Sequence, residues 1–270
     1  TACIEAMNPY DYVSYVWANA DANGSQFVEP FEKLFGIGQY GDINRYKNVK
    51  AYDIQKKVYN NSFSHSHDLS VSGGNENTKV LFSVNYNDEQ GMKVNSYNQR
   101  ANVSLKVNQK ISNNLNVGLD LRYTDVSIVS DESAGNNNGS LLSFAYRFRP
   151  IATEDLLGDT AAFREGAIEQ YGKYPLWDRY DPYNRIMDYE PLRQRQTLTG
   201  TVSLDWNILK GLRYHTDLTL RRSYNQNKIW GGAIHNNYID DATGEKQFAG
   251  AATLSMGNSW RMRWTNTLGY

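Results

Sequence analysis

The sequence predicts an all-β fold, with about seven strands forming a segment of an antiparallel transmembrane β-barrel whose long extracellular loops contain short helices. Three observations predict this fold class. Apolar and polar residues alternate over long segments, the pattern of strands with two different faces. The arms of the clearest hairpin cover about nine residues each, enough to cross a bilayer's hydrocarbon layer when tilted. Tyrosine is abundant, with 20 in 270 residues, and tyrosine and tryptophan favour the boundary between lipid and water.

The clearest hairpin lies between residues 100 and 124. In 100–108 aliphatic residues alternate without a fault with asparagine, serine and basic residues, and 115–124 repeats this alternation. The polar residues 109–114 between them favour a turn. Two alternating arms across a short turn indicate an antiparallel hairpin.

The other strands follow the same pattern. Residues 1–61 show no sustained alternation and are interpreted as an extracellular loop region with short helical pieces near 10–20 and 41–59. The barrel segment is predicted over 62–270. A large loop, 128–195, interrupts it and holds a helical candidate at 141–148. The further strands are expected at 62–72, 80–87, 197–208, 212–221 and 260–270.

Composition narrows the function classes. Lys plus Arg number 28 and Asp plus Glu 29, a net charge of −1, which gives no reason to expect a nucleic-acid partner. Mean hydropathy is −0.65 and no apolar run reaches about 18 residues, so no transmembrane helix is predicted. The single Cys3 cannot form an internal disulfide. The chain starts at Thr1 without an initiator Met or signal segment and is interpreted as an internal piece of a longer protein.

The connections alternate in length, which predicts an orientation. Those at 73–77, 109–114 and 209–211 are short, and those at 88–98, 128–195 and 224–250 are longer. Bacterial outer-membrane barrels have short periplasmic turns and long extracellular loops, so the long connections are expected outside. Seven strands fall below the minimum of about eight in such barrels, so the remaining strands are expected in sequence beyond this segment.

Several segments resemble one family. The most specific is Leu69-Ser70-Val71-Ser72-Gly73-Gly74. Others are Asn8-Pro9-Tyr10-Asp11-Tyr12, Glu89-Gln90-Gly91, Asn114-Leu115-Asn116-Val117-Gly118, Ile208-Leu209-Lys210-Gly211-Leu212 and Asp181-Pro182. Taken in their order along the chain, these segments resemble the SusC/RagA family of TonB-linked outer-membrane proteins, in which Asn is more common at the position of Asp181.

This resemblance implies a barrel of about 22 strands plugged by an N-terminal domain. It also implies energy supplied by TonB through the missing N-terminal region, and import of an oligosaccharide or peptide cargo together with a SusD-like surface lipoprotein. The location implied is the outer membrane of a Gram-negative, Bacteroidetes-like cell. No catalytic residues and no cofactors are expected.

An aromatic cluster in the large loop is the candidate for substrate binding. Aromatic rings stack on the apolar faces of sugars, and an external loop is where cargo or a partner would land. The alternative is that these rings pack against one another as the core of the loop. The candidate residues are Tyr174, Trp177, Tyr180 and Tyr183, with Tyr171 beside them.

A second set of residues is expected to line the lumen. By alternation these side chains share the polar face, where they form either an anion path or a generic polar wall that faces the plug and water. They are Arg100, Lys106, Arg122, Arg213, Arg221, Arg261 and Arg263.

The histidines give no metal site. His65 and His67 are two apart on one strand face, but no third ligand is evident, so they are interpreted as part of an interfacial girdle with Phe63. His215 is expected to be isolated on the lumen face, where water satisfies it.

Two other functions fit parts of the pattern. A soluble β-sandwich or adhesin-like carbohydrate-binding module would use the alternation to separate a core from water. A passive porin would share the barrel but lack the plug. The long strands, and aromatic residues such as Trp206 and Trp264 at the strand ends, favour the membrane barrel over the sandwich.

Overall fold

The computed structural model describes residues 5, 7–23, 32, 35–37, 42–130, 148–158, 181–232, 235, 238–239, 246–247 and 250–270. The chain divides into two compact units, each considered by itself below. The strand unit comprises Asn61–Ser130, Glu190–Ile229 and Ala252–Tyr270. The helical unit comprises Thr1–Asn60, Asp131–Tyr189 and Trp230–Ala251. No helix within the described ranges is both long enough and apolar enough to span a membrane.

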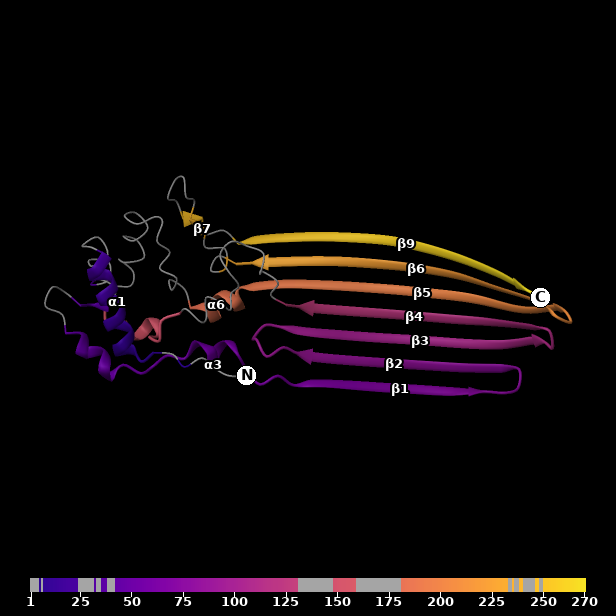
Figure 1. Ribbon diagram of the computed structural model, residues 1–270, viewed down its shortest axis with the longest axis horizontal. Coiled ribbons are helices and arrows are strands. Elements are labelled where there is room, and N and C mark those ends of the chain that lie inside the picture. Colours follow the sequence, from indigo (N-terminus) through magenta and orange to yellow (C-terminus); the bar gives the residue numbers. More distant parts are fainter. Residues whose placement is uncertain are drawn as a thin grey trace. The chain divides into compact units, whose positions relative to one another are not determined.

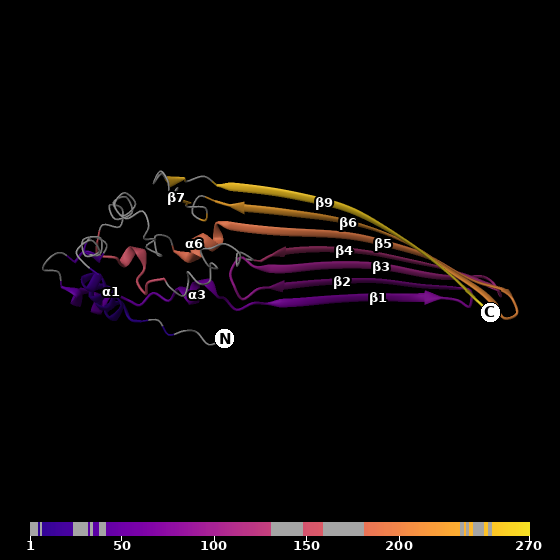
Figure 2. The ribbon, with the colours of Figure 1, turned by 45° about the horizontal axis from the view of Figure 1, so that its top comes forward.

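The strand unit is one antiparallel sheet of seven long strands (Figures 1 and 2). Its order is β1-β2-β3-β4-β5-β6-β9, so each strand pairs with its neighbour in the chain and β1 and β9 form the edges. The strands are β1 (Ser64–Gly74), β2 (Thr78–Gln90), β3 (Tyr97–Ser112), β4 (Leu115–Val129), β5 (Tyr189–Leu209), β6 (Leu212–Gly231) and β9 (Ala251–Gly269). The short strands β7 (Tyr238–Ile239) and β8 (Lys246–Gln247) pair separately.

Register gives the sheet one apolar and one polar face. Leu69, Val84, Val103, Tyr123 and Leu198 are successive cross-strand partners, so they form one row on the apolar face. The next row, one residue along, starts at Ser70 and continues through Ser83 and Ser104 on the opposite face. Because side chains alternate along a strand, the sequence pattern becomes two chemically distinct surfaces.

The apolar face is exposed along the sheet. Leu69 is 60%, Val202 49% and Trp264 66% exposed. The strand unit, as described, contains this one sheet and no second sheet packed on it, whereas a sandwich would bury the apolar face against another sheet. The predicted fold class, a segment of an antiparallel barrel wall, is confirmed.

The strands are longer than the sequence predicted. β4 continues to Val129, β5 already begins at Tyr189 and β6 continues to Gly231, so the loop expected at 128–195 is confined to 130–188. Near these ends the apolar face carries polar residues such as Asp125, Gln194 and Gln226. Alternation therefore disappears from the sequence although backbone pairing continues.

The three short turns are staggered across the sheet. Gly74, at the end of β1, lies in the row that contains Lys79, Asn108, Gly118 and Ser203. From that row β3 extends four residues further, from 108 to 112, and β5 six further, from 203 to 209. Such a stagger is the register shift that accompanies strand tilt in barrels.

The turn after β1 depends on a glycine and an asparagine. Asn75 Oδ1 accepts hydrogen bonds from the backbone N–H groups of Asn77 (2.9 Å) and Thr78 (2.8 Å). Gly74 has φ of 153°, and a Cβ there would lie 2.1 Å from the carbonyl oxygen of Thr78. The turn thus requires glycine at position 74.

The helical unit contains short capped helices. They are α1 (Pro9–Asn23), η1 (Ile43–Asn48), α3 (Ile54–Val58), η3 (Thr153–Asp155) and α6 (Pro182–Met187). The helical pieces predicted near 10–20 and 41–59 are confirmed by α1, η1 and α3. The sequence analysis assigned this region to the large loop at 128–195 and did not predict α6. The candidate helix at 141–148 lies, up to residue 147, outside the described residues.

Unlike the sheet, the helical unit has a buried apolar core. Tyr46 is at its centre, where its hydroxyl donates to the carbonyl oxygen of Phe35 (2.7 Å) and accepts from the N–H of Leu157 (3.3 Å). Burial raises the pKa of this phenol. The cluster consists of Val13, Phe35, Ile37, Tyr46, Ile151 and Leu156.

The two adjacent glycines of β1 give a matched test of the turn. We expect Gly74→Ala to destabilise the folded protein by roughly 1–3 kcal/mol, because the new methyl group meets backbone atoms. Gly73→Ala is the control, since no atom lies within 4 Å of a Cβ at that position. The measurement is the urea midpoint of unfolding of the complete protein in detergent micelles. Equal midpoints for the two variants would contradict the expectation.

Candidate functional site

The predicted aromatic cluster can be placed only in part. Tyr171, Tyr174, Trp177 and Tyr180 lie outside the described residues. Tyr183 is half-buried in the first turn of α6, and its backbone N–H donates to Asp181 Oδ1 (2.8 Å). Substrate binding by this cluster therefore stays a prediction.

Asp181 is the residue on which α6 begins. It is the N-cap, and Pro182 follows it in the first helical turn. Both are sequence signals of a helix start, because the carboxylate accepts an otherwise unpaired N–H and proline lacks one. The Asp-Pro pair could therefore have predicted this helix.

The carboxylate of Asp181 also contacts α3 and the residue Tyr52 that precedes it. The Tyr52 hydroxyl donates to Asp181 Oδ2. Lys57 Nζ lies 3.9 Å from this carboxylate oxygen and 4.7 Å from the centre of the Tyr52 ring. Burial, reinforced by the hydrogen bond and the negative charge of Asp181, raises the pKa of the Tyr52 phenol. Asp181 thus connects two short helices that are far apart in the sequence.

The other end of α6 has its own polar contacts. Asp188 Oδ2 accepts from the backbone N–H of His235 (3.0 Å), and the His235 ring stacks on Tyr189 with 4.0 Å between centroids. A Cβ at position 232 would lie 2.0 Å from Asp188 Oδ1. Only glycine at this position therefore allows the backbone to lie so close to the carboxylate.

The seven basic residues expected to line the lumen all lie in strands on the polar face. Register places the first three there, and the contacts of β6 with β5 and β9 place the other four. Three of them have partners on the same face. Arg122 pairs bidentately with Asp120 (2.9 and 2.8 Å), Arg213 pairs with Asp205 (2.6 Å), and Arg100 Nε donates to Asn102 (3.3 Å).

The remaining four are Lys106, Arg221, Arg261 and Arg263. They are exposed, and within the described part of the chain they have no ion pair. Because acids on the same face neutralise Arg122 and Arg213, this face is not a uniformly positive surface.

A row of hydrogen-bonded side chains crosses the polar face, and all of them except the carboxylate of Asp68 are neutral. Asn85 Nδ2 donates to Asp68 (2.5 Å), Asn102 Nδ2 donates to Asn85 (3.0 Å), and the Thr124 hydroxyl donates to Asn102 (2.9 Å). These four residues are successive cross-strand partners. Their amides and hydroxyls can exchange hydrogen bonds with water or with an uncharged polar ligand.

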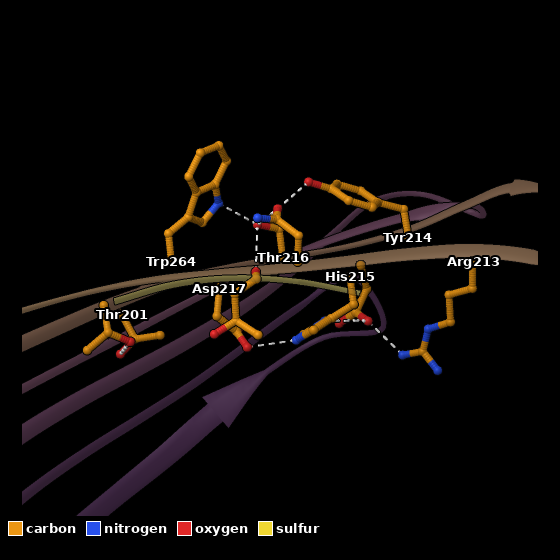
Figure 3. Close-up of polar contacts among 11 residues, drawn as sticks. Thr201, Arg213, Tyr214, His215, Thr216, Asp217 and Trp264 are labelled. Atoms are coloured by element: carbon orange, nitrogen blue, oxygen red, sulfur yellow. Dashed lines mark hydrogen bonds and ion pairs between the residues drawn. The ribbon is translucent and has the colours of Figure 1, made fainter. Parts of the chain in front are cut away.

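His215 is not isolated, contrary to the expectation from the sequence. Its Nδ1 lies 3.0 Å from Asp205 Oδ1 and its Nε2 lies 2.8 Å from Asp217 Oδ2 (Figure 3). The His-x-Asp spacing puts Asp217 on the same face, and the hairpin register brings Asp205 opposite. The sequence contained both signals. Water is therefore not its main partner.

The opposite face of β6 is joined to β9 by a chain of polar contacts (Figure 3). Trp264 Nε1 donates to the Thr216 hydroxyl (2.9 Å), which donates to Asn266 Oδ1 (2.8 Å). The Tyr214 hydroxyl also donates to Asn266 Oδ1 (2.6 Å). Polar groups on the apolar face thus bond to one another.

Aromatic rings gather on the apolar face of β1 and β2. His65 stacks on Phe63 at 5.8 Å and contacts His67 at 5.2 Å and Tyr86 at 6.0 Å between centroids. These contacts fit the interfacial girdle predicted from the sequence. Among the described residues no group of three or more His, Cys, Asp or Glu is arranged to hold a metal.

Comparisons with known proteins identify the fold. No family model and no curated protein sequence matches the chain. The solved RagAB peptide importer in its open-open state matches 97% of this chain with a TM-score of 0.65 and 16% identity. The closed-closed state matches 98% with a TM-score of 0.53 and 13% identity. This chain spans 29% and 38% of those two chains, so the likeness covers part of their fold.

The contacts of Asp181 can be separated by two variants. We expect Asp181→Ala to speed amide hydrogen exchange in 182–187 by about ten-fold or more, because it removes the cap and leaves the Tyr52 hydroxyl unpaired. Tyr52→Phe removes only the hydrogen bond and should have a smaller effect. The measurement is hydrogen exchange followed by mass spectrometry on the complete protein. Unchanged protection in Asp181→Ala would show that α6 does not depend on this carboxylate.

Proposed function

We propose that this chain is part of the barrel of a TonB-dependent importer of the outer membrane. The observation that carries the proposal is the single-layer sheet whose apolar face stays exposed along strands of 11–21 residues. A water-soluble protein would cover such a surface, whereas lipid covers it in a membrane. The structural likeness to the RagAB peptide importer supports the same conclusion.

The dimensions of the sheet agree with a membrane wall. A strand of 16 residues such as β3 covers roughly 50 Å at ~3.3 Å per residue, more than the hydrocarbon layer requires at the usual tilt. The short turns would lie in the periplasm and the long connections outside. The polar face with its basic residues and amide rows would line the lumen.

The cargo would pass through this lumen without chemical change, so the protein is a transporter and not an enzyme. Neutral amides and hydroxyls, with partly neutralised charges, suit a peptide or an oligosaccharide, which both offer many hydrogen-bonding groups. The structural likeness to the RagAB peptide importer favours a peptide as the cargo. The partners proposed are a SusD-like surface lipoprotein at the outer loops and TonB at a region outside this chain.

The orientation of the two faces can be tested at neighbouring residues. In a Cys3→Ser background of the complete protein, Val202→Cys lies on the apolar face and Ser203→Cys on the polar face. We expect a lipid-soluble maleimide to label position 202, and a small water-soluble maleimide to label position 203 preferentially. Labelling is measured by mass spectrometry of outer-membrane vesicles. Water-soluble labelling at 202 would mean that the apolar face is not in lipid.

The substrate role of the aromatic cluster needs an uptake measurement. We expect the double variant Trp177→Ala, Tyr180→Ala to lower uptake of a fluorescent peptide or docking of the lipoprotein several-fold while the barrel still assembles, because stacking contacts are lost. Tyr15→Ala is the control, an exposed ring in α1. Normal uptake by the double variant would remove the cluster from the site. Uptake that persists without TonB would indicate a passive porin.

A further inference from the structure

One charged residue lies where the apolar face of β6 changes character. Counted from the short turn at 210–211, the residues of β6 on this face are Leu212, Tyr214, Thr216, Leu218, Leu220 and then Arg222. Arg222 is thus the first charged side chain on this face of the strand, and it is exposed. In the orientation proposed above it lies toward the outer surface, at the end of the apolar band. A cation facing lipid at that depth needs an anion or water as its partner.

The side chain of Arg222 contacts two residues of the neighbouring strand β9. Its Nε lies 3.4 Å from Asn258 Oδ1, and its guanidinium carbon lies 5.2 Å from the centre of the Trp260 ring. Stacking on tryptophan fixes the plane of the guanidinium. Within the described residues neither terminal nitrogen has a protein partner, and Arg222 forms no ion pair.

The acidic residue Asp125 on this face has hydrogen-bond partners other than Arg222. Asp125, on β4, accepts from Gln196 (3.1 Å) and Tyr123 (3.3 Å). Lys228 is a further basic residue, six positions along β6 on the same face, and it is exposed. The surface beyond the apolar band on β6 is therefore cationic.

We infer that Arg222 and Trp260 form a binding site for the phosphate of a lipid headgroup in the outer leaflet. A planar guanidinium bonds two phosphate oxygens at once, while the indole and the neighbouring apolar residues contact the acyl chains. Such a lipid brings the anion to the depth at which the cation lies. The inference depends on the membrane position proposed above for this sheet.

The neighbouring arginine provides a matched control. Arg221 has the same charge and backbone position to within one residue, but its side chain lies on the polar face. Arg222→Gln and Arg221→Gln therefore remove one positive charge each from opposite sides of the same strand. Only the first should change lipid binding.

The experiment uses the complete protein in phosphatidylcholine nanodiscs doped with diphosphoryl lipid A or with its dephosphorylated form. Retained lipid is counted by native mass spectrometry after release from the disc. We expect wild type and Arg221→Gln to retain the phosphorylated lipid equally, and Arg222→Gln about five-fold less, the factor that ~1 kcal/mol represents. The dephosphorylated lipid should be retained weakly by all three.

Three results would overturn the inference. They are equal retention by Arg222→Gln and wild type, equal loss in Arg221→Gln, and displacement of the lipid by millimolar inorganic phosphate, which would indicate a site for the free anion. Insertion into the nanodisc is scored separately by detergent-free gel filtration. Failure to insert would refute the proposed membrane function itself, whereas insertion with unchanged lipid retention would refute only the headgroup site.

Discussion

Backbone pairing in a single register is the constraint on which the sheet depends. Each strand from β1 to β5 pairs with the next over nearly its whole length, with one irregularity between Lys110 and Ser112. A slip of one residue would exchange the two faces of a strand. The row from Asp68 to Thr124, the pairing of His215 and the continuity of the apolar face all require the same register. The polar contacts on each face in turn make a slipped register costly.

The part of the fold governed by alternation could be predicted from the sequence. The seven strands, the short turns and the side of the sheet on which each basic residue lies all follow from period two. The strand ends could not be located in this way. Beyond Leu198 on β5 and Leu220 on β6 the apolar face also carries polar residues such as Gln194 and Gln226, so little contrast marks the residues that still pair. The strands continue because backbone hydrogen bonding needs no particular side chain.

In the helical unit, the contacts between helices could not be predicted from the sequence. Two of its helical regions were predicted from the sequence, but the contact between Tyr52 and Asp181 joins residues 129 positions apart. Nothing local to either residue indicates the other, since short helices with little periodicity can pack in many ways. The charge cluster of Asp205, Arg213 and His215 is different, because the hairpin turn fixes which residues are opposite. That cluster could be predicted once the register was known.

In the proposed orientation, the stagger of the three short turns changes how position along a strand relates to depth in the membrane. Residues at equal depth are not cross-strand partners but lie on a diagonal. On β5 and β6 this diagonal passes several positions closer to the turn than the row that contains the β1 residue. A plane parallel to the bilayer that passes Tyr86 would meet β6 near Leu218 and not at Tyr224, where the direct row crosses that strand. A map of substitutions ordered by cross-strand partners would therefore mix lipid tails with headgroups, whereas one ordered along the diagonals would separate them.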